Sequence, residues 1–382
     1  VKNPDAKNIG QIKLHDIGDY LTREQKLEII TEYKNLNGIT AANGWQTIVP
    51  DEFDDWVNQR DPNFDSYISL GDKKDKSKLT IFENYSAGIV TSRDAWVYNF
   101  SKKILAESIN TTVKTYNTSI INNIEISDDK KISWSRGLRK LLDNKKKINF
   151  DATNMRSSAY RPFTKLHLYF DRPIIEMILK MPQIFPKNHL SNRVICIVGK
   201  GETVGFSCLI SDKTPNYHFM SSNQCFPMYL YEKMENDETS EGENFNLLAE
   251  KNQKLSNDVN IISDEDGIPL YRCKDAINNE GLAHFVDYYS EQMNADDSIS
   301  KEDLFYYIYG LLHSEDYRER YAENLTKQLP NIPRVQRFDN FTAFSKAGRN
   351  LADLHIDYEN VDMYQGVKIT SKPTNIKLAD GQ

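Results

Sequence analysis

The segment Ser158–Arg172, which reads SAYRPFTKLHLYFDR, constrains the fold more than any other stretch of this chain. From Thr164 onward apolar and polar side chains alternate, which predicts a β-strand with two unlike faces. The apolar face carries Leu166, Leu168 and Phe170, and the polar face carries Lys165, His167 and Tyr169. Pro162 restricts the residue before it to extended conformations, so Arg161 is predicted at the mouth of the strand. The polar face fits both a solvent-exposed edge strand and a binding surface.

Length and composition place the chain among globular proteins. With 382 residues it is long enough for two or three domains, and its 39% hydrophobic and 27% charged residues are ordinary for that class. No run approaches the roughly eighteen apolar residues of a membrane helix, and no signal-peptide pattern opens the chain, so no membrane contact is expected. The chain begins with Val1 rather than Met, which predicts an excised fragment.

The four cysteines and seven histidines show no metal-binding spacing. Cys196, Cys208, Cys225 and Cys273 form no CxxC pair, and the histidines form no HxxxH pair. A structural zinc site or a disulfide framework is therefore not expected, and the cysteines are predicted to be small buried hydrophobic residues. This usage predicts a reducing, cytoplasmic location.

Charge is segregated along the chain. The formal net charge of -7 argues against nucleic-acid binding through the whole surface. Between Lys130 and Lys147, however, eight basic residues are opposed by Asp143 alone, whereas residues 236–267 are rich in acidic and small polar residues. A local basic face is therefore predicted within a protein that is acidic overall.

The basic segment contains a predicted short helix, Trp134–Asn144, that directs leucines inward and Arg136, Arg139 and Lys140 outward. The chain continues through Lys145, Lys146 and Lys147 to Asn154, Arg156, Ser157 and Ser158. Such side chains bind phosphates and read base edges. The segment therefore predicts nucleic-acid contact, although charge runs of this kind also form faces that meet only solvent.

Hydrophobic periodicity predicts an α+β fold. Two β segments are predicted over residues 81–100, interrupted at Ser92–Asp94, and a continuous apolar run predicts a buried strand at Val194–Val198. Helices are predicted from Ser101, over residues 274–291, from Ser300, from Ser314 and over residues 340–355. The arrangement indicates a twisted mixed or antiparallel β region followed by a bundle-like helical part.

The predicted domain organisation follows these changes in pattern. Residues 1–80 form a connector whose first helix is capped by Thr22 and Gln25, and residues 81–235 form a β-rich subdomain. Residues 236–270 are predicted to be a polar variable loop because they lack periodicity. Residues 271–382 form a helical scaffold.

Sequence signatures of catalysis are missing. The stretch Gly199–Gly205 lacks the GxxxxGK[ST] pattern of a phosphate-binding loop and continues as a strand, so it is predicted to be a hairpin turn. No glycine-rich S-adenosylmethionine loop, [DNS]PP[YF] motif, Walker motif, HExxH or GxSxG occurs. No catalytic residue is therefore assigned, and the chain is predicted to be a recognition module rather than an enzyme on its own.

Five separated stretches read FENYSAGIVTSRDAWVYNFSKK, YRPFTKLHLYFDR, SNQCFPMYLYE, KEDLFYYIYGLLHSEDYRERYAENLTKQLPNIP and AFSKAGRNLADLHIDYE. Together they resemble the C-terminal specificity region of Type ISP restriction–modification enzymes. The opening, VKNP followed by HDIGDYLTREQKL, is similar to the segment that leaves the family's adenine methyltransferase domain, so residues 1–80 are assigned to a methyltransferase-exit segment. The nuclease, helicase and methyltransferase domains that the family carries upstream are not in this sequence.

The resemblance implies a target-recognition domain that holds a short asymmetric site in double-stranded DNA. In the full-length enzyme the neighbouring methyltransferase would flip an adenine out of that duplex for N6-methylation. S-adenosylmethionine, ATP and magnesium are expected cofactors of the full-length enzyme, where ATP drives translocation and cleavage, and none is expected in this chain. The alternative is a structural module that couples the methyltransferase to the helicase motor without reading bases.

The predicted DNA contacts combine the basic segment with the central strand. Phosphate contacts are predicted for Arg136, Arg139, Lys145, Lys146 and Lys147. Base or groove contacts are predicted for Asn154, Arg156, Arg161, Lys165, His167 and Arg93. Arg93, at the break between the two predicted β segments, is equally able to pair with Asp94.

Overall fold

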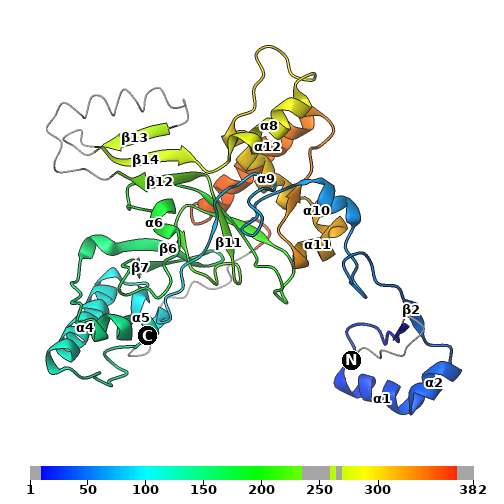
Figure 1. The fold of residues 1–382 in the computed structure, drawn as a ribbon, viewed down its shortest axis with the longest axis horizontal. Coiled ribbons are helices and arrows are strands. Elements are labelled where there is room, and N and C mark those ends of the chain that lie inside the picture. Colours follow the sequence, from blue (N-terminus) through cyan, green and yellow to red (C-terminus); the bar gives the residue numbers. More distant parts are fainter. Residues whose placement is uncertain (1–9, 235–258, 264–268, 368–382) are drawn as a thin grey trace. The chain divides into compact units, whose positions relative to one another are not determined.

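The computed structural model describes residues 10–234, 259–263 and 269–367 (Figure 1). The chain divides into two compact units, residues 1–66 (unit 1) and residues 67–382 (unit 2). Both units contain helices and strands, which confirms the predicted α+β class. The finer predicted division of residues 81–382 into three parts stays a prediction.

Unit 1 pairs two short strands and carries two helices. β1 (Ile12–Leu14) lies antiparallel to β2 (Gln46–Ile48), and α1 (Arg23–Tyr33) precedes α2 (Leu36–Ala41). The predicted capping box is confirmed, since Gln25 N donates to Thr22 Oγ1 at 3.3 Å and Thr22 N donates to Gln25 Oε1 at 2.8 Å. The apolar stripe of α1 lies exposed, with Leu27 at 52% and Ile30 at 63% of their full exposure.

One four-stranded sheet of unit 2, here called the hairpin sheet, has the strand order β10-β6-β7-β5. Its strands are β10 (Thr214–Pro215), β6 (Met155–Arg161), β7 (Thr164–Tyr169) and β5 (Tyr98–Asn99). β6 and β7 form an antiparallel hairpin in which Arg156 lies opposite Leu168 and Ser157 lies opposite His167. β7 confirms the strand that the alternating pattern predicts.

The predicted division of β7 into an apolar and a polar face holds for only part of the strand. Leu168 is fully buried as predicted, but Tyr169, on the predicted polar face, is also 0% exposed. The Phe150 ring stacks on the Tyr169 ring at 5.6 Å between centroids, and Asp151 N donates to the Tyr169 hydroxyl at 3.0 Å. Both faces are covered at this end of β7 because the residues just before β6 pack over it.

A second four-stranded sheet is antiparallel throughout, in the order β4-β11-β8-β9. Its strands are β4 (Ser86–Ala87), β11 (Gln224–Pro227), β8 (Val194–Ile197) and β9 (Cys208–Ser211). β8 is buried along its whole length, which confirms the strand predicted at residues 194–198. α9 (Lys301–Leu312) packs against this sheet, since the Phe305 ring contacts Phe82, which in turn contacts Phe226 of β11.

The predicted loop at residues 236–270 contains strands at its C-terminal end. β13 (Val259–Ser263) pairs antiparallel with β14 (Pro269–Asp275), and β12 (Tyr229–Lys233) completes a three-stranded sheet. The loop prediction was wrong there because these short runs become strands through pairing with neighbours, and such runs are too short to show a period. Residues 236–258 and 264–268 of the predicted loop lie outside the described residues.

The remaining elements of unit 2 are mostly helical. They are α3 (Asp94–Val97), α4 (Lys102–Asn122), α5 (Arg136–Asp143), α6 (Met181–Ile184), α8 (Asn279–Tyr289), α10 (Glu315–Arg320), α11 (Ala322–Lys327) and α12 (Phe338–Ile356), with β15 (Asn331–Ile332) paired to β3 (Ile68–Ser69). Two predicted boundaries were wrong. Residues 95–97, predicted as part of a strand, belong to the helical turn Asp94–Val97, in which the Thr91 hydroxyl donates to the Asp94 carboxylate. The helix predicted from residue 274 begins after Asn278, because residues 274–275 pair within β14.

α9 and α12 cross at two glycines. An added Cβ at Gly348 would lie 2.0 Å from Tyr306 O, and one at Gly310 would lie 2.6 Å from Phe344 O. Because both clashes are with backbone atoms, no side-chain rotation relieves them. The two helices therefore lie closer together than any larger residue permits, and they form the helical part of unit 2 together (Figure 1).

The N-terminal end of α5 is held by two side chains from elsewhere in unit 2, the buried Arg93 and the partly buried Glu176. Arg93 is 4% exposed, and its guanidinium donates to Ile174 O at 2.5 Å and to the Ser135 hydroxyl. The same hydroxyl accepts from Leu138 N at 3.3 Å and so caps α5. Glu176 accepts from Gly137 N at 3.1 Å, which satisfies another free amide of the first turn. Burial lowers the pKa of Arg93, and the nearby Glu176 carboxylate opposes that change.

We expect Gly348→Ala to lower the free energy of unfolding by about 2–3 kcal/mol, because α12 must move away from α9 to admit the methyl group. Gly205→Ala is the matched control, since a Cβ at Gly205 meets no atom within 4 Å. Chemical denaturation of the two variants measures the difference. Equal stabilities would contradict the close crossing of the helices.

We expect Arg93→Ala to lower the free energy of unfolding by about 2–4 kcal/mol, because Ile174 O and the Ser135 hydroxyl lose a buried donor. Arg136→Ala removes an exposed arginine from the neighbouring helix and should change the same quantity by less than about 0.5 kcal/mol. Urea denaturation of both variants tests this pair. An Arg93→Ala variant as stable as Arg136→Ala would show that Arg93 does not hold α5.

Candidate nucleic-acid interface

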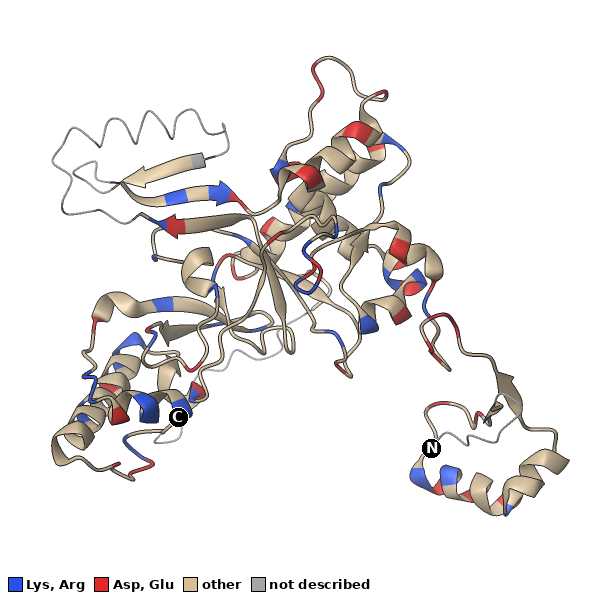
Figure 2. Ribbon diagram, viewed as in Figure 1, with Lys and Arg blue, Asp and Glu red and all other residues tan. Residues whose placement is uncertain are grey.

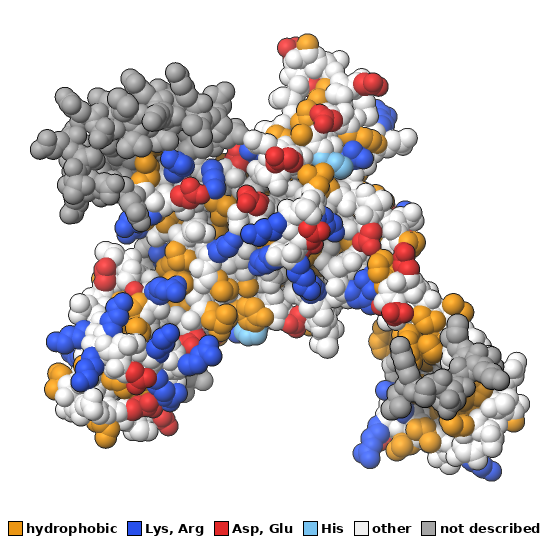
Figure 3. All heavy atoms as spheres, in the orientation of Figure 1, with side chains coloured by type: hydrophobic (Ala, Val, Ile, Leu, Met, Phe, Trp, Pro, Cys, Tyr) orange, Lys and Arg blue, Asp and Glu red, His pale blue; other side chains and the backbone are white. Residues whose placement is uncertain are grey.

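Exposed basic side chains gather on α5 and on the loop that follows it. The exposed residues are Arg136, Lys140, Lys145, Lys146 and Lys147, here called the α5 basic cluster. Figure 2 marks Lys and Arg positions along α4 and α5, and Figure 3 shows Lys and Arg side chains crowding this part of unit 2. None of the ion pairs found within the described ranges involves a member of this cluster. The cluster therefore carries positive charge that no nearby carboxylate compensates.

The loop that carries Lys145, Lys146 and Lys147 is fixed to α4 through its backbone. The Tyr116 hydroxyl donates to Lys146 O at 2.8 Å. Asn117 Nδ2 donates to Ile148 O at 2.7 Å, and Asn117 Oδ1 accepts from Ile148 N at 3.2 Å. Ile148 is 3% exposed, so it anchors the end of the loop in the core. The backbone is thus held while the lysine side chains project into solvent.

Arg139 differs from its neighbours on α5 because its charge is compensated. Its Nε donates to Glu125 Oε2 at 2.8 Å, and its Nη2 donates to Glu125 Oε1 at 3.0 Å. These hydrogen bonds lower the pKa of the Glu125 carboxyl. A phosphate at Arg139 would have to compete with this bidentate pair, so Arg139 is a weaker candidate than the α5 basic cluster.

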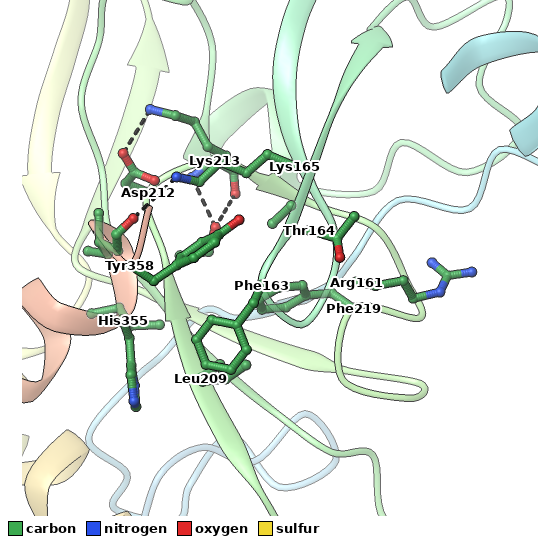
Figure 4. A pocket seen from close by; sticks show the side chains of 14 residues that line it. Arg161, Phe163, Thr164, Lys165, Leu209, Asp212, Lys213, Phe219, His355 and Tyr358 are labelled. Atoms are coloured by element: carbon green, nitrogen blue, oxygen red, sulfur yellow. Dashed lines mark hydrogen bonds and ion pairs between the residues drawn. The ribbon is translucent and has the colours of Figure 1, made fainter. Parts of the chain in front are cut away.

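Arg161 lies at the mouth of the β6–β7 hairpin, as predicted. Its guanidinium lies 4.0 Å above the Tyr160 ring, and Nη1 donates to Tyr160 O at 2.7 Å and to Asn216 Oδ1 at 3.1 Å. In Figure 4 the guanidinium points away from the pocket residues drawn around it. Nε and Nη2 donate to no protein acceptor in the described part of the chain. A fixed guanidinium with two spare donors is suited to a bidentate contact.

A pocket of about 380 Å³ beside the hairpin sheet is lined by two predicted residues, Arg156 and His167. Four further basic side chains line the same pocket: Lys102, Lys187, His189 and Lys213. Lys213 forms an ion pair with Asp212 at 2.7 Å, whereas Lys187 and His189 are exposed. Periodicity and charge runs did not predict these four residues, because they come from separate segments that only the fold brings together.

Arg156 reaches this pocket with most of its guanidinium enclosed. Nη1 donates to Phe185 O at 2.6 Å, and the group lies 4.0 Å from the centre of the Phe170 ring. Burial lowers the pKa of Arg156 to about 10. Asn154, the last predicted residue of this region, ends the short 3₁₀ helix Ala152–Asn154, and its carbonyl accepts from Phe170 N at 2.8 Å. Both residues therefore support the sheet, and Arg156 presents less of its guanidinium to a ligand than Arg161 does.

Lys165 joins the hairpin to the C-terminal end of α12 (Figure 4). Its ammonium donates to Ile356 O at 3.3 Å and forms an ion pair with Glu359 at 2.9 Å. Phe163, at the tip of the hairpin, packs edge-on against the rings of His355 and Tyr358 at 5.8 and 5.3 Å between centroids. The partners of Lys165 argue against the predicted DNA contact, because a phosphate would have to displace both.

The structure therefore separates the predicted contacts into three groups. The α5 basic cluster and Arg161 present donors to solvent, and His167 lines a pocket. Arg139 and Lys165 are occupied by carboxylates, and Arg156 is largely enclosed. Arg93 is buried and holds the N-terminus of α5, which argues against its predicted contact with DNA. Its guanidinium is hydrogen-bonded to Ile174 and Ser135 rather than paired with Asp94.

Other kinds of site were sought within residues 10–234, 259–263 and 269–367. This part of the chain holds no group of three or more His, Cys, Asp or Glu side chains arranged to bind a metal ion. None of its helices is both long and apolar enough to cross a membrane. Cys196, Cys208 and Cys225 are buried, and Cys273 is partly exposed.

Comparison with known proteins places these features in a family. A family model described as the Type ISP C-terminal specificity domain matches residues 80–380. The ATP-dependent Type ISP restriction–modification enzyme LlaBIII bound to DNA is 32% identical at a TM-score of 0.74, over 96% of this chain and 21% of that one. A nuclease-deletion mutant of the Type ISP enzyme LlaGI, in complex with a DNA substrate mimic, is 32% identical at a TM-score of 0.69, over 95% of this chain and 25% of that one.

A third similar structure is a DrdV–DNA complex, which is 28% identical at a TM-score of 0.64, over 84% of this chain and 28% of that one. No curated protein sequence matches this chain. The chain thus spans between 21% and 28% of the length of these three relatives. Because the family model covers residues 80–380, which include nearly all of unit 2, this chain belongs to the Type ISP C-terminal specificity domain family.

Proposed function

We propose that this chain recognises a site in double-stranded DNA as the specificity part of a longer Type ISP restriction–modification enzyme. The α5 basic cluster carries the proposal, because three of its lysines project from an anchored loop and have no carboxylate partner. The three similar structures support it, since each of those proteins was solved with DNA or a DNA mimic. The alternative is a coupling module that makes no base contacts. That role gives no reason for lysines without carboxylate partners on a loop that faces solvent.

The charge distribution suits binding to one face of a duplex. The chain as a whole carries a net charge of -7, so most of its surface repels a polyanion. DNA is attracted only where the cations are concentrated, and each phosphate neutralised there releases counterions from the duplex. Binding through the α5 basic cluster is therefore expected to orient the DNA and to depend steeply on salt concentration.

Arg161 is the residue that we propose for base readout. Stacking on Tyr160 and the hydrogen bond to Asn216 fix the plane of its guanidinium before DNA arrives. Nε and Nη2 then have the spacing that fits the O6 and N7 atoms of a guanine in the major groove. His167, Lys187 and His189, around the pocket beside the hairpin sheet, are proposed as secondary groove contacts.

The role of the longer enzyme also belongs to this proposal. S-adenosylmethionine, ATP and magnesium would be bound by domains outside this chain, which serve adenine methylation, translocation and cleavage. The site recognised here would be presented to the methyltransferase, and base flipping requires a duplex gripped from the side opposite the active site. A cytoplasmic location, where cellular DNA is accessible, follows from the same role.

Reversing the charge of the anchored lysines tests the phosphate contacts. The variant Lys145→Glu/Lys146→Glu/Lys147→Glu should bind duplexes of every sequence about tenfold or more weakly at low salt. The slope of log affinity against log salt should become shallower by about 0.9 for each phosphate that the variant no longer neutralises. Fluorescence anisotropy with labelled duplexes across a salt series measures both quantities.

The matched control is Lys26→Glu/Lys34→Glu/Lys346→Glu, which changes the net charge equally at exposed positions outside the cluster. This control should retain the affinity and the salt slope of the parent to within about twofold. If the variant in the α5 basic cluster binds as tightly as the parent, the cluster does not contact DNA. If the parent itself binds no duplex at low salt, the coupling-module alternative is favoured.

Arg161→Ala tests base readout separately from affinity. Selection of bound duplexes from a library with randomised sequence should show reduced preference at one base pair, equivalent to about 1–3 kcal/mol of discrimination. The control Arg172→Ala removes another arginine near the same strand, at an exposed position, and should keep the preferences of the parent. Unchanged preferences in the Arg161→Ala variant would exclude a base contact by this residue.

A further inference from the structure

A second basic surface of unit 2 lies on the loop at residues 71–79, between β3 and β4. The base of the loop is closed by backbone hydrogen bonds from Ile81 N to Ser69 O at 3.0 Å and from Phe82 N to Leu70 O at 2.8 Å. Gly71 allows the loop to lie against Tyr85, because an added Cβ would be 2.7 Å from a carbon of that ring. The path of this loop is thus defined by contacts at both of its ends.

The two carboxylates of the loop are occupied by the loop itself. Asp72 Oδ1 accepts from Lys74 N at 2.8 Å and from Asp75 N at 3.1 Å. Asp75 Oδ1 accepts from Ser77 N at 2.9 Å and from Ser77 Oγ at 2.6 Å. These hydrogen bonds from the loop lower the pKa of both carboxyls, so they stay ionised and turned into the loop. They fix the turn, and their two negative charges, one of which interacts with Lys78 and Lys200, are outnumbered by the lysines around them.

Six lysines surround this turn and form what we call the loop basic cluster: Lys73, Lys74, Lys76, Lys78, Lys180 and Lys200. All six are exposed, and none takes part in an ion pair found in the described ranges. The Lys73 ammonium lies 4.0 Å from the centre of the Tyr85 ring, and burial together with the neighbouring Lys180 lowers the pKa of Lys73. Like charges held this close favour an anion between them.

The segments that carry the loop basic cluster and the α5 basic cluster are linked through neighbouring residues of unit 2. Lys180 follows Met177, which is hydrogen-bonded to Val90 in both directions at 2.9 and 3.0 Å. Val90 and Ser133 line one pocket of about 370 Å³, and Ser133 lies just before α5. Figure 3 shows Lys and Arg side chains in the middle of the same face that displays the α4–α5 part. A short path of neighbouring residues, from Lys180 through Met177 and Val90 to Ser133, thus joins the two clusters within unit 2.

We propose that the loop basic cluster binds a second stretch of the phosphate backbone of the same DNA duplex. This inference rests on the proposed function and adds a contact surface to it. Lysines suit phosphate contacts, because an ammonium binds a phosphate as a point charge and does not require a fixed planar geometry. A spread of six cations also matches a ligand whose charges repeat along its length.

The test reverses exposed charges of the loop. The variant Lys74→Glu/Lys76→Glu/Lys78→Glu leaves Lys73 on its aromatic partner, and Lys74→Gln/Lys76→Gln/Lys78→Gln is a milder second variant. Affinity and salt slope are measured with a short duplex that spans only one cluster and a long duplex that spans both. Circular dichroism and thermal unfolding establish that each variant is folded. The triple variant at Lys26, Lys34 and Lys346 is again the charge-matched control.

We expect the Glu variant to bind the long duplex about tenfold or more weakly and with a shallower salt slope, and the Gln variant to be affected less. The short duplex should bind both variants and the parent alike when it is held at the α5 basic cluster. When the Glu variant is combined with the Lys145–Lys147 variant, the reductions in slope should add, because the two surfaces are separate.

The possible results distinguish a failure of this inference from a failure of the proposed function on which it rests. If the Lys145–Lys147 variant weakens binding while the Lys74, Lys76 and Lys78 variants bind the long duplex like the parent, the second contact is refuted and the function stands. If neither the parent nor any variant binds either duplex, the proposed function fails. A weakening on the short duplex equal to that on the long one would show that the loop does not contact a second stretch of backbone.

Discussion

The buried guanidinium of Arg93 is the interaction on which the basic face over α5 depends. Burying an arginine is costly unless its donors find acceptors, and here Nη1 and Nη2 donate to Ile174 O and the Ser135 hydroxyl. Ser135 caps α5, and Glu176 accepts from the next free amide of that helix. One buried cation thus orients the helix whose exposed side carries other cations. The arrangement gives the α5 basic cluster a fixed support made from residues that lie beneath its exposed side chains.

A comparable division of roles appears in the hairpin sheet. Phe163 and Lys165 tie the tip of the β6–β7 hairpin to the end of α12, while Arg161, at the same turn, keeps part of its guanidinium free. Phe163 has a φ of 53°, which a residue other than glycine adopts at a cost. Packing against His355 and Tyr358 compensates that cost. Through these contacts with the hairpin, the helical part of unit 2 helps to fix the backbone at Arg161. The guanidinium of Arg161 is held separately, by hydrogen bonds to Tyr160 and Asn216.

The distribution of charge explains how a protein with a net charge of -7 can bind a polyanion. Two carboxylates of the loop at residues 71–79 accept hydrogen bonds from the loop itself, and Glu125 is paired with Arg139. The neighbouring lysines outnumber these carboxylates, so both surfaces keep an excess of positive charge. Positive charge is concentrated on two clusters, and the remaining surface disfavours other orientations of DNA. Specific orientation, rather than overall attraction, follows from such a distribution.

Local pattern alone was enough to predict several elements correctly. Alternation over Thr164–Phe170 identified β7, and a continuous apolar run identified β8. The capping box of Thr22 and Gln25 and the helix start at Ser300 were also predicted correctly. Each of these depends on residues a few positions apart, where backbone geometry links pattern to structure directly. The short strand β13 and the helical turn at residues 94–97 escaped prediction, because pairing partners and one local hydrogen bond decided them.

The charge of the segment Lys130–Lys147 was determined by the sequence itself, and so was the family to which the five resembling stretches point. Tertiary structure alone decided which cations are available. It buried Arg93, enclosed Arg156 and paired Arg139 and Lys165, and it brought Lys102, Lys187 and His189 from distant segments into one pocket. The physical reason is that exposure and ion pairing depend on which residues become neighbours in space. The separation of two residues along the chain does not reveal whether the fold brings them together.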